Sequence, residues 1–272
     1  MELGKIGVWR RRLDGLDALE EIEALGYGTF WVGGSPSVEH ARAFLQRTSR
    51  MTVATGILNV WQHEPADVAA QHAAVRRDFP GRFLLGIGIG HPEATAEYQT
   101  PLERMRAFFD GLDAAPRPVP RDERAAAALG PKMLDLAAEH SLGSHTYFVP
   151  VEHTRFARER LGPDALVAPE LAVVVEPDDE TARAAARKYA KLYLGLGNYA
   201  NNLKRFGFTD RDIADGGSDR LIDAVIPHGS AERIAEAVRA HLAAGADHVA
   251  LQPLGHGPAP AADYEALARA LL

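Results

Sequence analysis

The sequence predicts an α/β protein, a single (β/α)8 TIM barrel that spans residues 1–272. Short apolar runs alternate with amphipathic segments along the chain, and about eight such units fit into its length, as this barrel requires. Most of the runs are apolar throughout, which is typical of parallel strands covered by helices. A doubly wound sheet is the alternative, because one sequence does not fix the number of strands.

The predicted strands are residues 5–9, 29–34, 51–58, 83–90, 125–130, 145–149, 170–176 and 248–253. The alanines of the fifth run suit a helix equally well. Leucine and isoleucine recur every three residues from Leu13 to Leu25 and predict the first helix. Another begins near Pro65, a residue that a first helical turn tolerates, and ends before Gly81. A third follows Ser230, a favourable N-cap.

Two segments depart from this alternation of apolar strands and amphipathic helices. Residues 114–124 are rich in proline and charge and predict a surface connection. Residues 179–223 are too long for one barrel helix. We expect a long helix, a turn near residues 195–197, and an insertion after the seventh strand, at about residues 190–224, beside the site.

Composition excludes several classes of protein. The net charge is −7, which argues against a nucleic-acid partner. The chain has no cysteine, and therefore no disulfide, catalytic thiol or thiolate metal site. No apolar stretch is long enough to span a bilayer, and the first residues lack the apolar core of a signal peptide. We expect a cytoplasmic protein that acts on a small molecule without a membrane partner.

The stretch "GRFLLGIGIGH" places Gly86, Gly88 and Gly90 at alternate positions. Their spacing differs from the G-x-G-x-x-G of a dinucleotide fold, because His91 stands where that motif needs its third glycine. In a strand these glycines share one face, and something can pack against bare backbone there. His91 then lies at the carboxyl end of a strand, the catalytic end of a barrel. Alternatively, the glycines only relieve crowding inside the barrel.

Several segments together resemble the luciferase-like flavin and deazaflavin oxidoreductases, in particular the short branch that depends on coenzyme F420. They are "ATGILNVW", "RFLLGIGIGH", "LGPKMLDLAAEH" with "GSHTYFV", and "AAGADHVALQ". The resemblance covers nearly the whole chain and implies the same barrel. It also implies that the ring of the cofactor, F420 or alternatively FMN, lies in the barrel mouth.

The resemblance implies a cis peptide bond between Gly56 and Ile57, at the end of the third strand. It implies that the phosphate-bearing tail lies at residues 129–133, where a helix N-terminus and Lys132 favour an anion. The implied cofactor residues are Thr55, Gly56, Ile57, Asn59, Gly88, Gly90, Leu129, Gly130, Lys132 and Met133. Trp61, His63, Tyr199 and Asn202 are the residues we expect near the substrate.

A deazaflavin transfers a hydride, so the protein must orient the substrate and supply a proton where one is needed. His91 is the expected proton donor or acceptor, because the pKa of histidine lies near neutrality. The sequence departs from well-understood deazaflavin dehydrogenases at Gly34–Ser35, where those enzymes have an acidic residue and a histidine. The mechanism of those dehydrogenases therefore cannot be carried over to this chain. Lys204 and Arg205 are expected to be solvated surface charges.

Three other functions compete with this one. An FMN-dependent monooxygenase would share the fold and most cofactor contacts. A non-catalytic deazaflavin-binding protein would explain the departure at residues 34–35. A metal-dependent hydrolase is disfavoured, because the first strand carries no ligand, and His140 and His145 are expected on the surface rather than on a metal. The resemblance also implies a homodimer.

Overall fold

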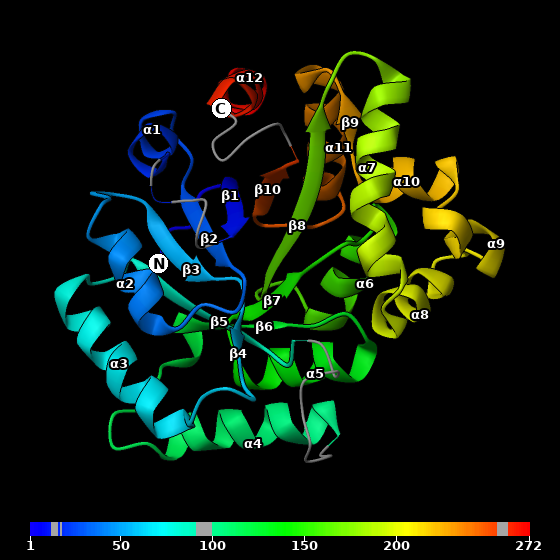
Figure 1. Ribbon diagram of the computed structural model, residues 1–272. Helices are drawn as coiled ribbons and strands as arrows, with labels where there is room; N and C mark the ends of the chain where they lie inside the picture. The colour runs from blue at the N-terminus through cyan, green and yellow to red at the C-terminus, as the bar shows by residue number, and fades with distance from the viewer. Residues whose placement is uncertain (12–15, 17, 91–99, 255–260) are drawn as a thin grey trace.

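A computed structural model describes residues 1–11, 16, 18–90, 100–254 and 261–272. Eight parallel strands close into a barrel, and the last pairs with both the first and the seventh (Figure 1). In order around the barrel they are β1 (Ile6–Arg11), β2 (Thr29–Gly33), β3 (Thr52–Thr55), β5 (Phe83–Gly88), β6 (Arg124–Ala127), β7 (Gly143–Thr146), β8 (Leu166–Val175) and β10 (Val249–Pro253). Two short strands, β4 (Leu58–Asn59) and β9 (His228–Gly229), pair with β5 and β8.

Helices surround the strands (Figure 1). They are α1 (Leu19–Ala24), α2 (Val38–Leu45), α3 (Pro65–Asp78), α4 (Pro101–Ala114), α5 (Pro131–His140), α6 (Val151–Leu161), α7 (Asp179–Leu194), α8 (Gly197–Arg205), α9 (Asp210–Ile213), α10 (Asp219–Val225), α11 (Ala231–Ala243) and α12 (Ala261–Leu271), with 3-10 turns η2 (Arg121–Glu123) and η3 (Ala214–Gly216). Within the described ranges, no helix is both long and apolar enough to cross a membrane.

The predicted barrel is confirmed, and each of the eight apolar runs overlaps one barrel strand. Pro65 stands in the first turn of α3, and the side chain of Ser230 accepts a hydrogen bond from the N–H of Arg233 at the start of α11. The run 145–149 was predicted too late, because β7 begins at Gly143. The described part of the first predicted helix is α1, which begins only at Leu19.

The alternation of side chains along each strand separates two cores. Residues such as Val8 and Phe30 point outward into the layer between strands and helices. The barrel interior instead holds Trp31, which stacks on His145 with ring centroids 4.0 Å apart. The indole N–H of Trp31 donates to Nε2 of His248, at 3.0 Å. Because these rings fill the centre, the interior positions around them are small: Ala54, Ala125, Ala168 and Ala250.

The inserted segment forms a separate small core. After the long helix α7, helices α8, α9 and α10 occupy residues 197–225 and gather on one side of the barrel (Figure 1). Their apolar side chains pack against α7 and the far end of β8, and Phe148, after β7, joins the same cluster. This confirms the expected insertion after the seventh strand.

Candidate functional site at the carboxyl end of the barrel

The end of β3 forms one wall of the barrel mouth. The peptide bond between Gly56 and Ile57 is cis, as the resemblance implies. The indole N–H of Trp9 donates to the carbonyl oxygen of Gly56, at 3.1 Å. A Cβ atom on Gly56 would lie 2.8 Å from that indole nitrogen, and one on Gly33 would lie 2.2 Å from the same ring. The two glycines therefore let Trp9 close the barrel interior beneath the mouth.

The space beside the glycines of β5 is taken up by protein atoms. A Cβ atom on Gly86 would lie 1.9 Å from the carbonyl oxygen of Thr55, and one on Gly88 would lie 2.9 Å from Ile57. One on Gly90 would lie 2.7 Å from the amide nitrogen of Asn59. Crowding between neighbouring strands thus accounts for these glycines without a ligand. Cofactor contact at Gly88 and Gly90 stays a prediction.

The predicted polar residues of this wall are partly engaged by the backbone. The hydroxyl of Thr55 is fully buried and donates to the carbonyl oxygen of Gly86, at 2.7 Å. Oδ1 of Asn59 accepts from the N–H of Trp61, at 3.0 Å. Trp61 is half-buried under the guanidinium of Arg104, and His63 is half-buried beyond it, where burial lowers its pKa. His91 lies outside the described residues.

The loop between β6 and α5 has the features of an anion site. Gly130 caps α5 without a side-chain hydrogen bond. Pro131 has no N–H and the N–H of Met133 donates to the carbonyl oxygen of Gly130, at 3.1 Å, so in the first turn the backbone N–H of Lys132 remains for another acceptor. Lys132 is exposed there, and Met133 is half-buried. Behind the loop, Nε2 of His153 lies 3.0 Å from the carbonyl oxygen of Leu129, and burial lowers the pKa of His153 to about 4. A neutral imidazole therefore donates to Leu129 and fixes the loop.

Arg205, expected to be only a surface charge, approaches this loop. Its Nη1 lies 3.2 Å from the position that a Cβ atom would take on Gly130. The inserted helix α8 thus brings a guanidinium to Gly130, at the N-terminus of α5. Sequence reasoning missed this arrangement because residues 130 and 205 are far apart in the chain and belong to different structural units.

The other predicted residues of α8 face inward. Tyr199 is buried, and its ring meets that of Tyr193 edge-on at 5.3 Å. Asn202, one turn further, is 2% exposed, and neither its oxygen nor its nitrogen has a hydrogen-bond partner among the described residues. Because Tyr199, Asn202 and Arg205 are spaced three residues apart, they share one side of the helix. Buried polar groups are nearly always hydrogen-bonded, so the carboxamide of Asn202 is an exception among the described residues.

A group of hydroxyl side chains was missed by the sequence reasoning. Tyr147 follows β7, Tyr189 and Tyr193 come from α7, and Gln252 comes from β10. The hydroxyl of Tyr147 contacts those of Tyr189 and Tyr193, and both Tyr147 and Tyr189 donate to Oε1 of Gln252, at 3.0 and 2.9 Å. We call these four residues the tyrosine cluster. Glu170 of β8 is 1% exposed, and its Oε1 has no hydrogen-bond partner among the described residues.

Two expectations about histidines were wrong. His140 and His145 are 7% and 2% exposed rather than on the surface. His145 stacks on Trp31, and burial lowers its pKa to about 3. Within the part of the chain that the structure describes, no group of three metal-ligating side chains comes together.

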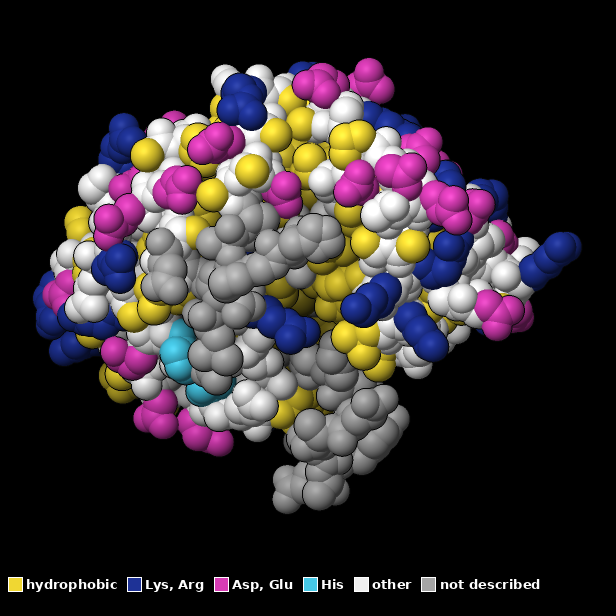
Figure 2. Space-filling model, turned by 45° about the horizontal axis from the view of Figure 1, so that its top comes forward, with side chains coloured by type: hydrophobic (Ala, Val, Ile, Leu, Met, Phe, Trp, Pro, Cys, Tyr) yellow, Lys and Arg dark blue, Asp and Glu magenta, His cyan; other side chains and the backbone are white. Residues whose placement is uncertain are grey.

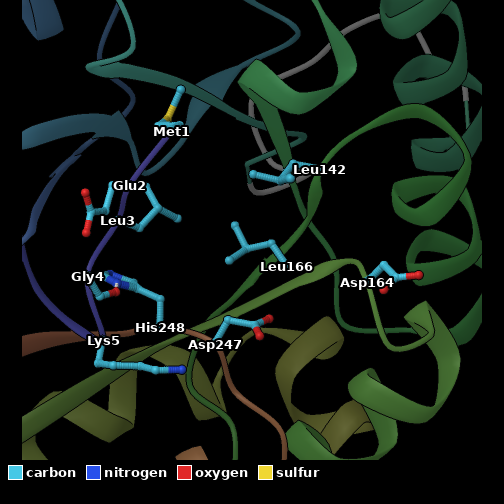
Figure 3. Close-up of a pocket in the computed structure, with 10 residues that line it drawn as sticks. All are labelled: Met1, Glu2, Leu3, Gly4, Lys5, Leu142, Asp164, Leu166, Asp247 and His248. Carbon is cyan, nitrogen blue, oxygen red and sulfur yellow. Dashed lines mark hydrogen bonds between the residues drawn. The ribbon is translucent and has the colours of Figure 1, made fainter.

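An open depression of about 480 Å³ lies at the opposite, amino end of the strands (Figure 3). It is lined by residues 1–5 and by residues just before or at the start of β7, β8 and β10, including His248. His248 is fully engaged there, because its ring contacts both Trp31 and the carbonyl oxygen of Gly4. Barrel enzymes carry their chemistry at the carboxyl end, so this depression is separate from the candidate site.

Comparison with known proteins agrees with this architecture. The chain superposes on an F420-dependent secondary alcohol dehydrogenase in complex with an F420-acetone adduct, with a TM-score of 0.78, 17% identity, and 99% and 98% of the two chains covered. The F420-dependent tetrahydromethanopterin reductase from Methanopyrus kandleri superposes with a TM-score of 0.77 and 15% identity, and the match covers 98% of each chain. A third similar structure is the oxygenating constituent of 3,6-diketocamphane monooxygenase from Pseudomonas putida, in complex with FMN. It superposes with a TM-score of 0.72 and 14% identity, and the match covers 97% of this chain and 95% of that one.

At the sequence level, 4-hydroxyprotoasukamycin monooxygenase from Streptomyces nodosus subsp. asukaensis is 26% identical over 129 residues. The match covers 43% of this chain and about a third, 34%, of that protein. The model of the luciferase-like monooxygenase family matches residues 14–248, which is most of the chain. The protein therefore belongs to the luciferase-like monooxygenase family.

Proposed function

We propose that this protein is an F420-dependent oxidoreductase that transfers a hydride between the deazaflavin and a small organic substrate in the mouth of the barrel. The observation that carries the proposal is the arrangement at the N-terminus of α5, where the guanidinium of Arg205 approaches Gly130 and the backbone N–H of Lys132 remains for an acceptor. Such a site suits the phosphate of a cofactor tail. Family membership and the barrel support an oxidoreductase.

The residues present fit a flat, phosphorylated cofactor. The wall at Gly56–Ile57, with Trp9 beneath it, offers an apolar surface for a ring. On the face shown in Figure 2, hydrophobic side chains gather in a central hollow, and Lys and Arg side chains lie beside it. The unpartnered amide of Asn202 offers a further polar contact. When bound, the deazaflavin would supply the hydride.

The protein would contribute orientation, exclusion of water and a proton. Asn59 and Gly130 would hold the two ends of the cofactor, while Trp61 and Tyr199 border the space left for substrate. His91 is the first candidate for the proton, on the basis of its position after β5 in the sequence.

An FMN-dependent monooxygenase is the second candidate, because a protein of similar fold was solved in complex with FMN and a relative in sequence is a monooxygenase. The phosphate contacts would be the same for both cofactors. We favour the deazaflavin because the sequence segments resemble the short F420-dependent branch.

Titration of the purified protein with F420 and with FMN tests the proposal, with affinity and absorbance recorded for each. The loaded protein is then offered a panel of alcohols, ketones and enones under anaerobic conditions. We expect F420 to bind more tightly than FMN and one of these classes to change the redox state of the deazaflavin. Tighter binding of FMN with oxygen-dependent turnover would instead assign a monooxygenase. Tight F420 binding without turnover would favour a non-catalytic binding protein.

A further inference from the structure

We propose that the side-chain amide of Gln252 binds the carbonyl oxygen of the substrate, and that Tyr147 and Tyr189 hold this amide in position. The inference rests on the proposed function, because it needs a substrate in the barrel mouth. It adds the chemical class of that substrate, which is a mostly apolar compound whose oxidised form is a ketone.

Gln252 faces the interior of the barrel near its carboxyl end. It stands two residues beyond Ala250 on β10, and Ala250 belongs to the interior core, so both side chains lie on the same face of the strand. The pairing of Val8 with Leu251 brings Trp9 of the neighbouring strand beside Gln252. Gln252 is therefore level with Trp9, the residue that closes the interior beneath the mouth.

The amide oxygen of Gln252 is held by two hydroxyl groups. Tyr147 and Tyr189 donate to Oε1, at 3.0 and 2.9 Å. One tyrosine follows β7 and the other belongs to α7, so the two bonds come from separate elements. Two donors occupy both lone pairs of the oxygen. Because a carboxamide is planar, fixing its oxygen from two directions also fixes where its nitrogen points.

The amide nitrogen of Gln252 remains for a ligand. Nε2 carries two hydrogen-bond donors and cannot accept. It makes no hydrogen bond to the described residues, yet it is not one of their buried polar atoms without a partner, and Gln252 is only half-buried. Nε2 is therefore accessible as well as oriented in advance. A group that only donates selects an acceptor such as a carbonyl oxygen over a hydrocarbon or an ammonium group.

The position of Gln252 favours the substrate over the cofactor. Around the barrel, β10 is separated from β5 by β1, β2 and β3 on one side and by β6, β7 and β8 on the other. The cofactor ring is proposed to lie at the end of β3, beside β5, and the tail at the start of α5. Gln252 thus lies across the mouth, on the side that the cofactor leaves free.

The surroundings of the amide suit an apolar substrate. The ring of Tyr147 lies 5.5 Å from that of Trp9 and 6.3 Å from that of Tyr199. Sites for small molecules are typically lined by apolar and aromatic side chains with a few polar groups that fix the orientation of the ligand. Here the rings would contact the body of the substrate, and the amide would orient its oxygen.

This contact also favours the transfer of a hydride. In the reduction of a ketone, the carbonyl carbon accepts the hydride, the electron pair of the C=O π bond moves to the oxygen, and the oxygen takes up a proton. The ketone is reduced to the alcohol and the deazaflavin is oxidised. The N–H of Gln252 stabilises the charge that develops on the oxygen, as the donors of an oxyanion hole do. The proton comes from a separate donor, for which His91 is the first candidate.

A purely structural role would make Gln252 a brace between β10, α7 and the residue after β7. Gln252→Glu separates the two roles, because it keeps the shape and both bonds from the tyrosine hydroxyls but removes the N–H donors. A brace tolerates this change, whereas a carbonyl site does not. Gln252→Met has a similar length and no charge, so it separates the loss of the donors from the added carboxylate.

The first test needs no cofactor. The glutamine side chains are labelled with 15N, and the NMR signal of the Gln252 amide is assigned by its loss in Q252M. Its hydrogens should exchange with water about as fast as those of Gln46, an exposed residue at the end of α2. The signal should shift with cyclohexanone but not with methylenecyclohexane, which has the same shape without the oxygen. In Tyr147→Phe and Tyr189→Phe the signal should move even without a ligand.

The second test is kinetic and uses F420 with the most active carbonyl compound of the panel. Q252E and Q252M should lower kcat about 100-fold without a change in F420 affinity. Y147F and Y189F should each lower kcat/KM about tenfold, because one bond to Oε1 remains in each variant. Gln46→Leu is the matched control and should behave like wild type.

Full activity of Q252E and Q252M would overturn the inference even if F420 binds and turns over. So would strong protection of the Gln252 amide hydrogens relative to those of Gln46, an equal response to the two probes, or turnover only of compounds without a carbonyl or hydroxyl oxygen. Failure to bind F420, or to turn over any compound, would instead overturn the proposed function. In that case the NMR comparison without cofactor still decides for or against Gln252 as a carbonyl site.

Discussion

Replacing Arg205 with alanine tests the proposed cofactor tail site. The guanidinium approaches the position of a Cβ atom on Gly130 to 3.2 Å, at the N-terminus of α5. A hydrogen bond to a charged group contributes about 1.5–3 kcal/mol. Because Arg205 is exposed, solvent screening reduces this, and we take the lower end of the range. The dissociation constant of F420 should therefore rise about tenfold, since about 1.4 kcal/mol corresponds to a factor of ten.

The assay is calorimetric or fluorescence titration of wild type, Arg205→Ala and Lys204→Ala. Lys204 is the adjacent residue on the same helix, but its ammonium pairs with Asp210, at 2.5 Å. Its replacement should leave affinity within about twofold of wild type. The difference in F420 affinity between wild type and R205A should also become smaller at high salt, because exposed charges are screened.

Riboflavin and FMN provide a second comparison, because only FMN carries a phosphate. R205A should bind FMN more weakly than wild type does, and its affinity for riboflavin should be unchanged. Equal affinities of wild type and R205A for both phosphorylated cofactors, or an equal loss for riboflavin, would refute the assignment of Arg205 to the phosphate.

Three further predictions concern turnover, packing and acid stability. His91→Ala should keep F420 affinity and lower kcat about 100-fold; an unchanged rate, measured in the same anaerobic assay, would remove His91 from the reaction. Gly86→Ala should lower the free energy of unfolding, measured in urea, by about 1–3 kcal/mol or more, because its Cβ atom would lie 1.9 Å from the Thr55 carbonyl oxygen. The control is Gly197→Ala, where open space surrounds the position of the added Cβ atom. Equal losses of stability in the two variants would contradict the packing argument. Burial lowers the pKa of His248 from 6.5 to about 4. As the pH drops from about 6.5 to 4, the unfolded chain therefore binds a proton before the folded protein does, and the free energy of unfolding should fall. A free energy of unfolding that does not change over this pH window would contradict the prediction.

The barrel was predictable because its evidence is local. Apolar runs and helix starts such as Pro65 and Ser230 are visible in single segments, and each lies where it was expected. Boundaries were less accurate where a strand begins without apolar residues. Gly143 and Ser144 belong to β7, yet neither carries the hydrophobic signal that marks a buried strand.

The site was predictable only where one segment carries it. The cis bond at Gly56–Ile57 was expected from the family resemblance of one contiguous segment, and the start of α5 from Pro131 in another. Arg205 and Glu170 acquire their surroundings from distant parts of the chain, and His145 is buried because Trp31 lies against it. One signal was available for Glu170, since a charged residue stands inside an apolar strand at an inward-facing position.

The most direct test of the whole account is a crystal structure of the protein soaked with F420. The account predicts the deazaflavin ring against Gly56–Ile57 and the phosphate between Arg205 and the N-terminus of α5. A phosphate bound elsewhere, or a ring in the depression at the amino end of the strands, would contradict it.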